Sequence, residues 1–261
     1  MPVVNVAAID RVLDIFEVFS IAQRPLSLTE IAEAAEMPKS TCHAIVATLV
    51  ARGYLYSLTR PRSLYPTRRL YDVACIIVDK DPFVERTTSL LERLRDSSRE
   101  TVILGKRQGD AVVYLQVIES AHSIRYSARP GDIKPLHSSS IGKAMLGRLK
   151  EPELRSWSKS HLLAAITPAT LTDPQALVDD VLAGRRKGYF QTRGENVDDV
   201  WAVAASIQVN EEWFAVALAG PRHRMESTMP ECARLLVATC SFIARQLSST
   251  TGVPGMTGAS R

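Results

Sequence analysis

The sequence predicts an α+β protein with two domains, an N-terminal winged helix-turn-helix and a C-terminal domain built on a mainly antiparallel sheet. Three observations support this prediction. The 261 residues exceed the usual size of a single domain. A basic span without any acid, from Pro38 to Tyr71, contains a helix pattern followed by a hairpin pattern. The second half then mixes strand and helix patterns along one chain, which is typical of α+β folds.

The composition is that of an ordinary globular protein and excludes several classes. Apolar residues make up 46% and charged residues 23% of the chain, and the net charge is +4. No run approaches the length of about 18 apolar residues that a membrane-spanning helix needs. The N-terminus lacks the pattern of a signal peptide, and the four cysteines form no CxxC pair. We therefore expect a cytoplasmic protein without membrane association, cofactor or metal.

Two helices are predicted before the basic span. The first runs from about Ala7 to Ala22, and a second begins at Ser27, where Glu30 three residues later completes a capping box. Leu26 flanks this start at a hydrophobic-staple position, with Ile31 as its partner. The first helix carries an apolar stripe at helical spacing, formed by Ile9, Val12, Leu13, Phe16 and Phe19.

A third helix is predicted in the segment "MPKSTCHAIVATLVARGYL", from Pro38 to about Arg52, with Gly53 placed to end it. Adjacent Cys42 and His43 could be read as a reactive pair, but neighbouring positions on a helix do not face each other. We expect Cys42 to point into the core and His43 to point outward. The buried stripe is predicted to be Cys42, Ile45, Val46 and Leu49.

A basic hairpin follows, with predicted strands Tyr54–Ser57 and Ser63–Thr67 around a tip at residues 59–62. Two short helices with such a wing are typical of a DNA-binding winged helix-turn-helix. Taken singly, each polar residue here could equally be a solvated side chain. Phosphate contacts are assigned to Lys39, Arg60 and Arg62. Base contacts are assigned to Ser40, Thr41 and His43, and Thr48 is a further candidate.

A linking helix is predicted from about Arg68 to Asp79, ending before Pro82. Its stripe is too apolar for a free linker and consists of Leu70, Val73, Ala74, Ile77 and Val78. We expect it to pack on a partner subunit in a homodimer or tetramer, because an operator with two half-sites requires a dimer. Docking on the chain's own second domain is the alternative. The predicted domains are 1–67, a linker at 68–82, 83–249, and a disordered tail at 250–261.

The second half contains further elements in a mixed order. An amphipathic helix at 86–100 is followed by two strands within 101–118 and another strand at 123–128. The remaining predicted helices are Ile141–Leu149, Pro174–Gly184 and Met229–Ser248, and the remaining strands are Tyr189–Thr192, Ala202–Val209 and Trp213–Ala219.

The second half does not carry an enzyme motif. His137 and the three serines that follow it, with Lys143, invite a hydrolase or phosphate-loop interpretation, but a P-loop needs Gly where His137 stands. No G-x-S-x-G is present, and no His and carboxylate cluster has metal-ligand spacing. We therefore assign no catalytic residue, and expect these side chains to fix a strand-to-helix turn beside a pocket.

The chain resembles the IclR-type bacterial transcriptional regulators over nearly its whole length. The resemblance lies in "RPLSLTEIAEAAEMPKSTCHAIVATLVARGYL" (24–55), "PLHSSSIGKAML" (135–146), "RRKGYFQTRGEN" (185–196) and "AVALAGP" (215–221), in the family's order and spacing. It implies a GAF-like effector-binding domain and regulation of transcription from a double-stranded DNA operator. One departure is Ala44, where an arginine is common. The alternative function is a small-molecule-processing enzyme with an accessory nucleic-acid module.

The resemblance also implies an effector site. Small-acid binders of the family often carry hydroxyls at two positions of the late strand, and this chain has Ala217 and Ala219 there. That favours a larger, more apolar ligand, such as an aromatic or extended organic acid, over pyruvate or glyoxylate. Each alanine could equally belong to the core. The implied site residues are Tyr126, Leu136, Ser140, Ile141, Thr192, Val200, Ala202, Ala217 and Ala219.

Overall fold

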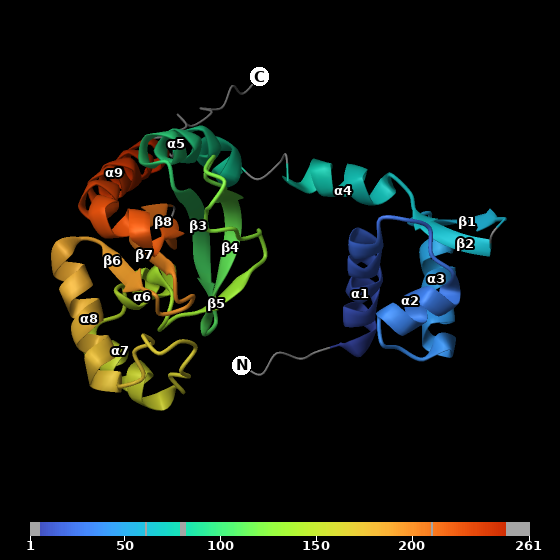
Figure 1. The fold of residues 1–261 in the computed structure, drawn as a ribbon, viewed down its shortest axis with the longest axis horizontal. Coiled ribbons are helices and arrows are strands. Elements are labelled where there is room, and N and C mark those ends of the chain that lie inside the picture. The colour runs from blue at the N-terminus through green and yellow to red at the C-terminus, as the bar shows by residue number, and fades with distance from the viewer. Residues whose placement is uncertain (1–5, 61, 79–81, 210, 249–261) are drawn as a thin grey trace, which may run out of the picture. The chain divides into compact units, whose positions relative to one another are not determined.

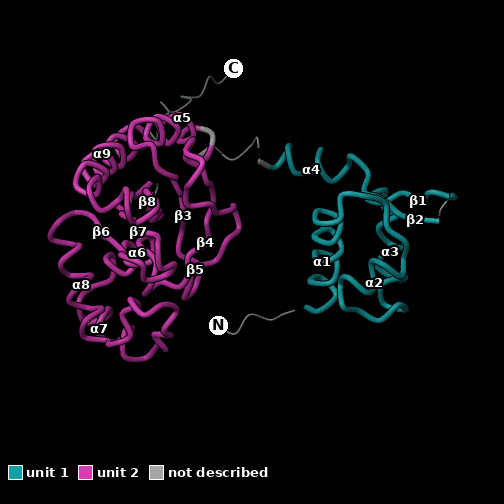
Figure 2. The backbone as a smooth tube through the Cα atoms, viewed as in Figure 1, with its two compact units in different colours: residues 1–82 teal, residues 83–261 magenta. Residues whose placement is uncertain are grey.

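The computed structural model describes residues 6–60, 62–78, 82–209 and 211–248. The chain divides into two compact units, residues 1–82 and 83–261 (Figure 2). Three predictions fall outside the described residues: the tip residue Pro61, the end of the linking helix at 79–81, and the disordered tail at 250–261. Among the described residues, no helix is both long and apolar enough to span a bilayer.

The first unit is a winged helix-turn-helix (Figure 1). The hairpin strands pair antiparallel, and Leu26 adds a bridge to Leu64 on the second strand. One core joins the first three helices and the hairpin. The elements are α1 (Ala7–Ala22), α2 (Leu28–Ala34), α3 (Lys39–Ala51), β1 (Leu55–Thr59), β2 (Arg62–Pro66) and α4 (Arg69–Val78).

The start of α2 confirms the predicted capping box. The Glu30 backbone N–H donates to Ser27 Oγ at 3.3 Å, and the Ser27 backbone N–H donates to Glu30 Oε2 at 2.7 Å. Leu26 and Ile31, the predicted staple pair, are both buried. Two otherwise unpaired backbone donors are satisfied here, so the start of α2 is fixed.

The end of α3 confirms the glycine stop. Gly53 has φ +75°. Its N–H donates to the Val50 carbonyl and the Tyr54 N–H donates to the Leu49 carbonyl. This paired arrangement is a Schellman motif, which needs the left-handed conformation that glycine adopts without strain.

The buried stripe of α3 is also confirmed. Cys42, Val46 and Leu49 are buried, and Ile45 is half-buried. Burial raises the pKa of the Cys42 thiol, while His43 is exposed. The two side chains therefore face different environments and form no reactive pair.

The predicted stripe on α1 is partly wrong. Ile9 and Leu13 are more than half exposed, whereas Ile15 and Val18 are buried beside Phe19. The helix is apolar on more than one side, and the unit's core packs against the side that carries Ile15. Periodicity alone did not determine which side faces inward.

The second unit is built on a sheet that has six strands among the described residues, in the order β5-β4-β3-β8-β7-β6, with every pair antiparallel. Helices α5 and α9 cover one face, while α6, α7 and α8 lie against the other (Figure 1). The elements are α5 (Pro82–Ser98), β3 (Thr101–Gln108), β4 (Ala111–Ile118), β5 (Ile133–Pro135), α6 (Ser140–Leu146), α7 (Glu151–Ser160), α8 (Pro174–Lys187), β6 (Phe190–Arg193), β7 (Val200–Val209), β8 (Glu212–Pro221) and α9 (Arg222–Ser248).

Alternate residues along the central strands serve the two faces. Val203, Val216 and Leu218 pack toward α5 and α9. The opposite face carries small side chains and lies under α6. These small residues are Ala202, Ala204, Ala215, Ala217 and Ala219. Their size lets a short helix approach the sheet closely.

Two predicted elements of this unit are wrong in position. Residues 123–128 are not a strand, and the edge strand is β5 instead. The Tyr126 carbonyl accepts from Thr101 Oγ1 at 2.6 Å, so a side chain rather than a ladder holds this segment. Helix α9 begins at Arg222 rather than at Met229, because buried Met225 and a pair of hydrogen bonds from Arg224 to Glu100 hold its first turns.

Candidate functional site

The outward side of α3 and the hairpin form the first candidate site. Lys39, Ser40, His43 and Thr48 are exposed on α3, and Thr41 is half-buried. In the hairpin, Arg60 and Arg62 are exposed. Among the described residues, no ion pair engages Lys39, Arg60 or Arg62, so their charges are available to an outside anion.

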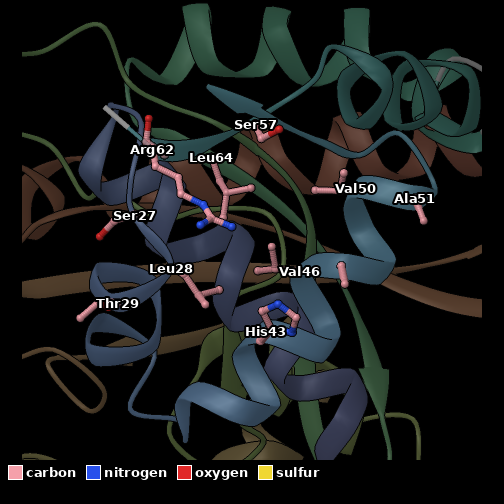
Figure 3. Close-up of a pocket in the computed structure, with 12 residues that line it drawn as sticks. Ser27, Leu28, Thr29, His43, Val46, Val50, Ala51, Ser57, Arg62 and Leu64 are labelled. Atoms are coloured by element: carbon pink, nitrogen blue, oxygen red, sulfur yellow. The ribbon is translucent and has the colours of Figure 1, made fainter. Parts of the chain in front are cut away.

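A groove of about 660 Å³ lies between α2, α3 and the hairpin (Figure 3). His43 from α3 and Arg62 from β2 both project into it over an apolar floor that includes Val46 and Leu64. The structure thus brings one predicted base-contacting residue and one predicted phosphate-contacting residue to the same concave surface. Thr48 lies elsewhere, in a hollow facing α1, and its hydroxyl donates to the Ala44 carbonyl at 3.0 Å.

The second candidate site is a cavity between the sheet and the start of α6, with a free volume of about 30 Å³. Seven residues implied by the resemblance line it: Tyr126, Ser140, Thr192, Val200, Ala202, Ala217 and Ala219. Leu136 and Ile141 do not line it and are buried in the adjoining core. Five further lining residues were not predicted: Ile103, Tyr114, Ser139, Asn196 and Val197.

The cavity offers neutral hydrogen-bonding groups and no charged side chain in its lining. Tyr114 is buried, and burial together with the neighbouring Tyr126 raises the pKa of its phenol well above the usual range. It therefore stays a neutral donor. Ser139 is already engaged, donating to the Pro135 carbonyl and accepting from the Gly142 N–H. A carboxylate here would be bound by hydroxyl and amide donors.

The segment behind the cavity has a structural role. His137 Nε2 lies 3.0 Å from the Ala164 carbonyl, and Ser139 caps α6. Lys143 is fully buried, with Nζ 2.7 Å from Asp180 Oδ2 and 2.7 Å from Glu195 Oε2. Burial raises the pKa of the Glu195 carboxyl against the opposing effect of Lys143. These contacts fix the turn, and among the described residues no His, Cys and carboxylate group could hold a metal.

A winged helix-turn-helix joined to a separate unit with a small internal cavity defines a DNA-binding transcriptional regulator with an effector domain. Two family models match the chain. The model described as "IclR helix-turn-helix domain" matches residues 8–58, and "Bacterial transcriptional regulator IclR C-terminal" matches residues 75–248. The chain belongs to the IclR family, whose members are transcriptional regulators rather than enzymes.

Individual relatives agree with this assignment. The HTH-type transcriptional regulator BhcR of Paracoccus denitrificans is 34% identical over 248 residues, covering 94% of this chain and 87% of that protein. The transcriptional repressor IclR of Escherichia coli is 27% identical over 226 residues, covering 85% of this chain and 82% of that protein. The crystal structure of Thermotoga maritima IclR has a TM-score of 0.76 at 23% identity, covering 92% of this chain and 99% of that one.

A further solved relative carries a ligand. An IclR homologue from Microbacterium hydrocarbonoxydans, complexed with 4-hydroxybenzoate, has a TM-score of 0.75 at 22% identity and covers 93% of this chain and 100% of that one. At this level of identity the likeness supports the shared fold alone.

Proposed function

We propose that this regulator acts in the cytoplasm, binds an operator through α3 and the hairpin, and responds to a small organic acid in the second unit. The observation that carries the DNA part is the groove that both His43 and Arg62 line. From Pro38 to Tyr71 the chain contains no acid that would repel phosphate. A helix beside a basic hairpin is the arrangement by which winged helices bind duplex DNA.

Within this surface we assign two roles. Lys39, Arg60 and Arg62 contact phosphates and set the position of the protein on the duplex. The polar residues of α3 contact base edges, with His43 the best supported because it projects outward beside Arg62. Ser40 and Thr41 lie at the start of the helix and are assigned the same role. Thr48 is a further candidate, although it lies in a hollow that faces α1.

The effector is proposed to be a small organic acid bound among the hydroxyls and the amide that line the cavity. An aromatic acid is one candidate, because Ala217 and Ala219 replace hydroxyl-bearing positions and because a related fold binds 4-hydroxybenzoate. The free volume of about 30 Å³ is far below the roughly 300–1,000 Å³ of typical small-molecule pockets. An aromatic acid therefore requires the cavity to open, whereas a short acid requires less movement.

The linking helix α4 supports a proposed homodimer or tetramer. Tyr71, Ile76 and Ile77 are each more than half exposed on this helix, and Leu70 is exposed as well. Such an apolar surface favours burial against a second copy, which would place two winged helices on two half-sites. Effector binding would then shift the spacing of the winged helices and change operator affinity.

A gel-shift assay with the DNA upstream of the chain's own gene tests the DNA part. We expect retardation that weakens steeply with salt, with a log–log slope of about −0.9 for each phosphate contacted. The double variant Arg60→Ala/Arg62→Ala should lose binding and flatten this slope. Arg186→Ala, which removes an exposed arginine of α8 in the second unit, is the matched control. Equal loss in both proteins would contradict the proposed surface.

His43→Glu tests the orientation of α3. It should sharply weaken DNA binding because it places an acid in the groove, and it should leave thermal stability unchanged because His43 is exposed. Unchanged DNA affinity would contradict the assignment. Repeating the gel shift with a panel of aromatic and short-chain organic acids then tests the effector class, and a panel without any effect would count against it.

A further inference from the structure

One side of the proposed effector cavity is lined by a short loop. Residues 194–199 connect β6 to β7, and two of them, Asn196 and Val197, line the cavity. Val197 is 42% exposed, whereas every other lining residue is buried or half-buried. The loop therefore carries the most solvent-exposed side chain of the cavity lining.

The first half of this loop is tied to partners in the body of the unit that do not line the cavity. Asn196 Nδ2 donates to Ser138 Oγ at 3.2 Å. The Glu195 carboxylate lies against the buried Lys143 ammonium. The hydroxyls of Thr167 and Thr170 donate to the carbonyls of residues 194 and 195, both at 2.7 Å.

The second half of the loop lacks such ties. Val197, Asp198 and Asp199 are exposed. Among the described residues, their only long-range hydrogen bond runs from the Arg222 N–H to the Asp199 carbonyl. Gly194 has φ +77°, and a Cβ there would lie 2.6 Å from the Asp198 carbonyl oxygen, so the turn itself is tight. The loop is therefore compact, with most of its side-chain ties in its first half.

We propose that the 194–199 loop is the gate of the effector cavity, and that Ser138 and Lys143 are positioning residues that hold it closed. Opening breaks the Asn196–Ser138 hydrogen bond and pulls the Glu195 carboxylate from Lys143. Because the free volume is only about 30 Å³, an acid needs the lining to move, and the 194–199 loop carries the most exposed side chain of that lining. The role of the gate in regulation rests on the proposed effector function, whereas its opening can be measured without an effector.

Ser138→Ala is the sharpest perturbation, because Ser138 is fully buried, does not line the cavity and holds Asn196 through its hydroxyl. Losing one hydrogen bond should raise the open population roughly 2- to 12-fold, equivalent to about 0.5–1.5 kcal/mol. Glu195→Gln should raise it at least as much, because the removed contact is charged, while Lys143 keeps Asp180 as a partner. Ser158→Ala is the matched control, since Ser158 is equally buried but lies on α7 and bonds within its own helix.

The assay measures entry of a small thiol reagent into the cavity. Ala219→Cys places a thiol at a lining position that is 2% exposed, and iodoacetamide labelling of the peptide carrying position 219 is followed by mass spectrometry. In the Ala219→Cys background, Ser138→Ala and Glu195→Gln should accelerate labelling, and Ser158→Ala should leave its rate unchanged. Unchanged labelling in both gate variants would overturn the proposal, as would equal acceleration in the Ser158→Ala control.

Separate outcomes distinguish the gate from the effector function. Accelerated labelling without any acid that binds the wild-type protein would leave the gate standing and count against the proposed effector. Saturable binding of 4-hydroxybenzoate or pyruvate, with labelling rates unaffected by the gate variants, would support the effector and overturn the gate.

Discussion

Replacing Lys143 with methionine should destabilise the second unit strongly and in a pH-dependent way. The lysine side chain is fully buried, and its ammonium is the cation shared by Glu195, whose side chain is 10% exposed, and Asp180, whose side chain is 35% exposed. Removing one partner of a buried ion pair costs about 3–5 kcal/mol because the remaining charge is left without compensation. Most of this loss comes from Glu195, since water screens the more exposed Asp180.

The pH dependence follows from the direction of the Glu195 shift. Burial raises the pKa of Glu195 above its ordinary 4.5, and Lys143 opposes that rise. Without Lys143 the pKa of Glu195 rises further, and a carboxyl with a raised folded-state pKa contributes its stability fully below 4.5 and loses it as pH rises through the folded value. The deficit of Lys143→Met should therefore be smallest near about pH 5 and largest near about pH 8.

Urea unfolding followed by tryptophan fluorescence measures this effect selectively. The chain's three tryptophans, Trp157, Trp201 and Trp213, all lie in the second unit, so the signal reports on that unit alone. Lys159→Met, which removes an exposed lysine of α7, is the control and should cost little. Lys143→Met/Glu195→Gln should regain much of the loss at high pH. A loss that is independent of pH, or a double variant no more stable than the single one, would refute the reasoning.

Three further substitutions test the local packing. Gly142→Ala should lower the free energy of unfolding by about 3 kcal/mol, the upper range for overpacking, since a Cβ would lie 2.3 Å from the Leu136 carbonyl oxygen; a midpoint equal to wild type would contradict this close approach. Ser27→Ala should cost about 1 kcal/mol by removing the cap that receives the Glu30 N–H, seen as faster hydrogen–deuterium exchange in α2. Cys42→Val should fold and retard DNA as the wild type does, and reduced gel-shift affinity would count against its purely apolar role.

The winged helix could be predicted from sequence because its signals are local. A capping box, a proline start and a glycine stop lie within a few residues of the elements they delimit, and the structure has all three. The helix α7 was missed because its segment is mostly polar and buries only Leu154 and Ser158. The orientation of α1 could not be predicted. Apolar residues recur at helical spacing on two sides of this helix, and only the tertiary packing decides which side is buried.

The lining of the proposed effector cavity was predicted only as far as the family resemblance reaches. Asn196 and Val197 lie in an irregular loop with no periodic pattern, so no sequence signal marked them as lining residues. The tie between Lys143, Asp180 and Glu195 joins residues far apart in the chain. In the sequence, the only sign of this tie is Lys143, a lysine within a short and largely apolar helix. In the sequence analysis, Lys143 was considered only as part of a hydrolase or phosphate-loop motif.

The size of the effector cannot be inferred from the alanines of the sheet alone. Ala217 and Ala219 suggest a roomy site when the strand is considered by itself, but the cavity they line has a free volume of only about 30 Å³. The small side chains of β7 and β8 lie under α6, so the space that they release is taken by this helix. Tyr114 and Tyr126 also line the cavity. Under the proposed gating, selectivity for an acid would depend on how far the 194–199 loop opens, more than on the two positions where this chain lacks a hydroxyl.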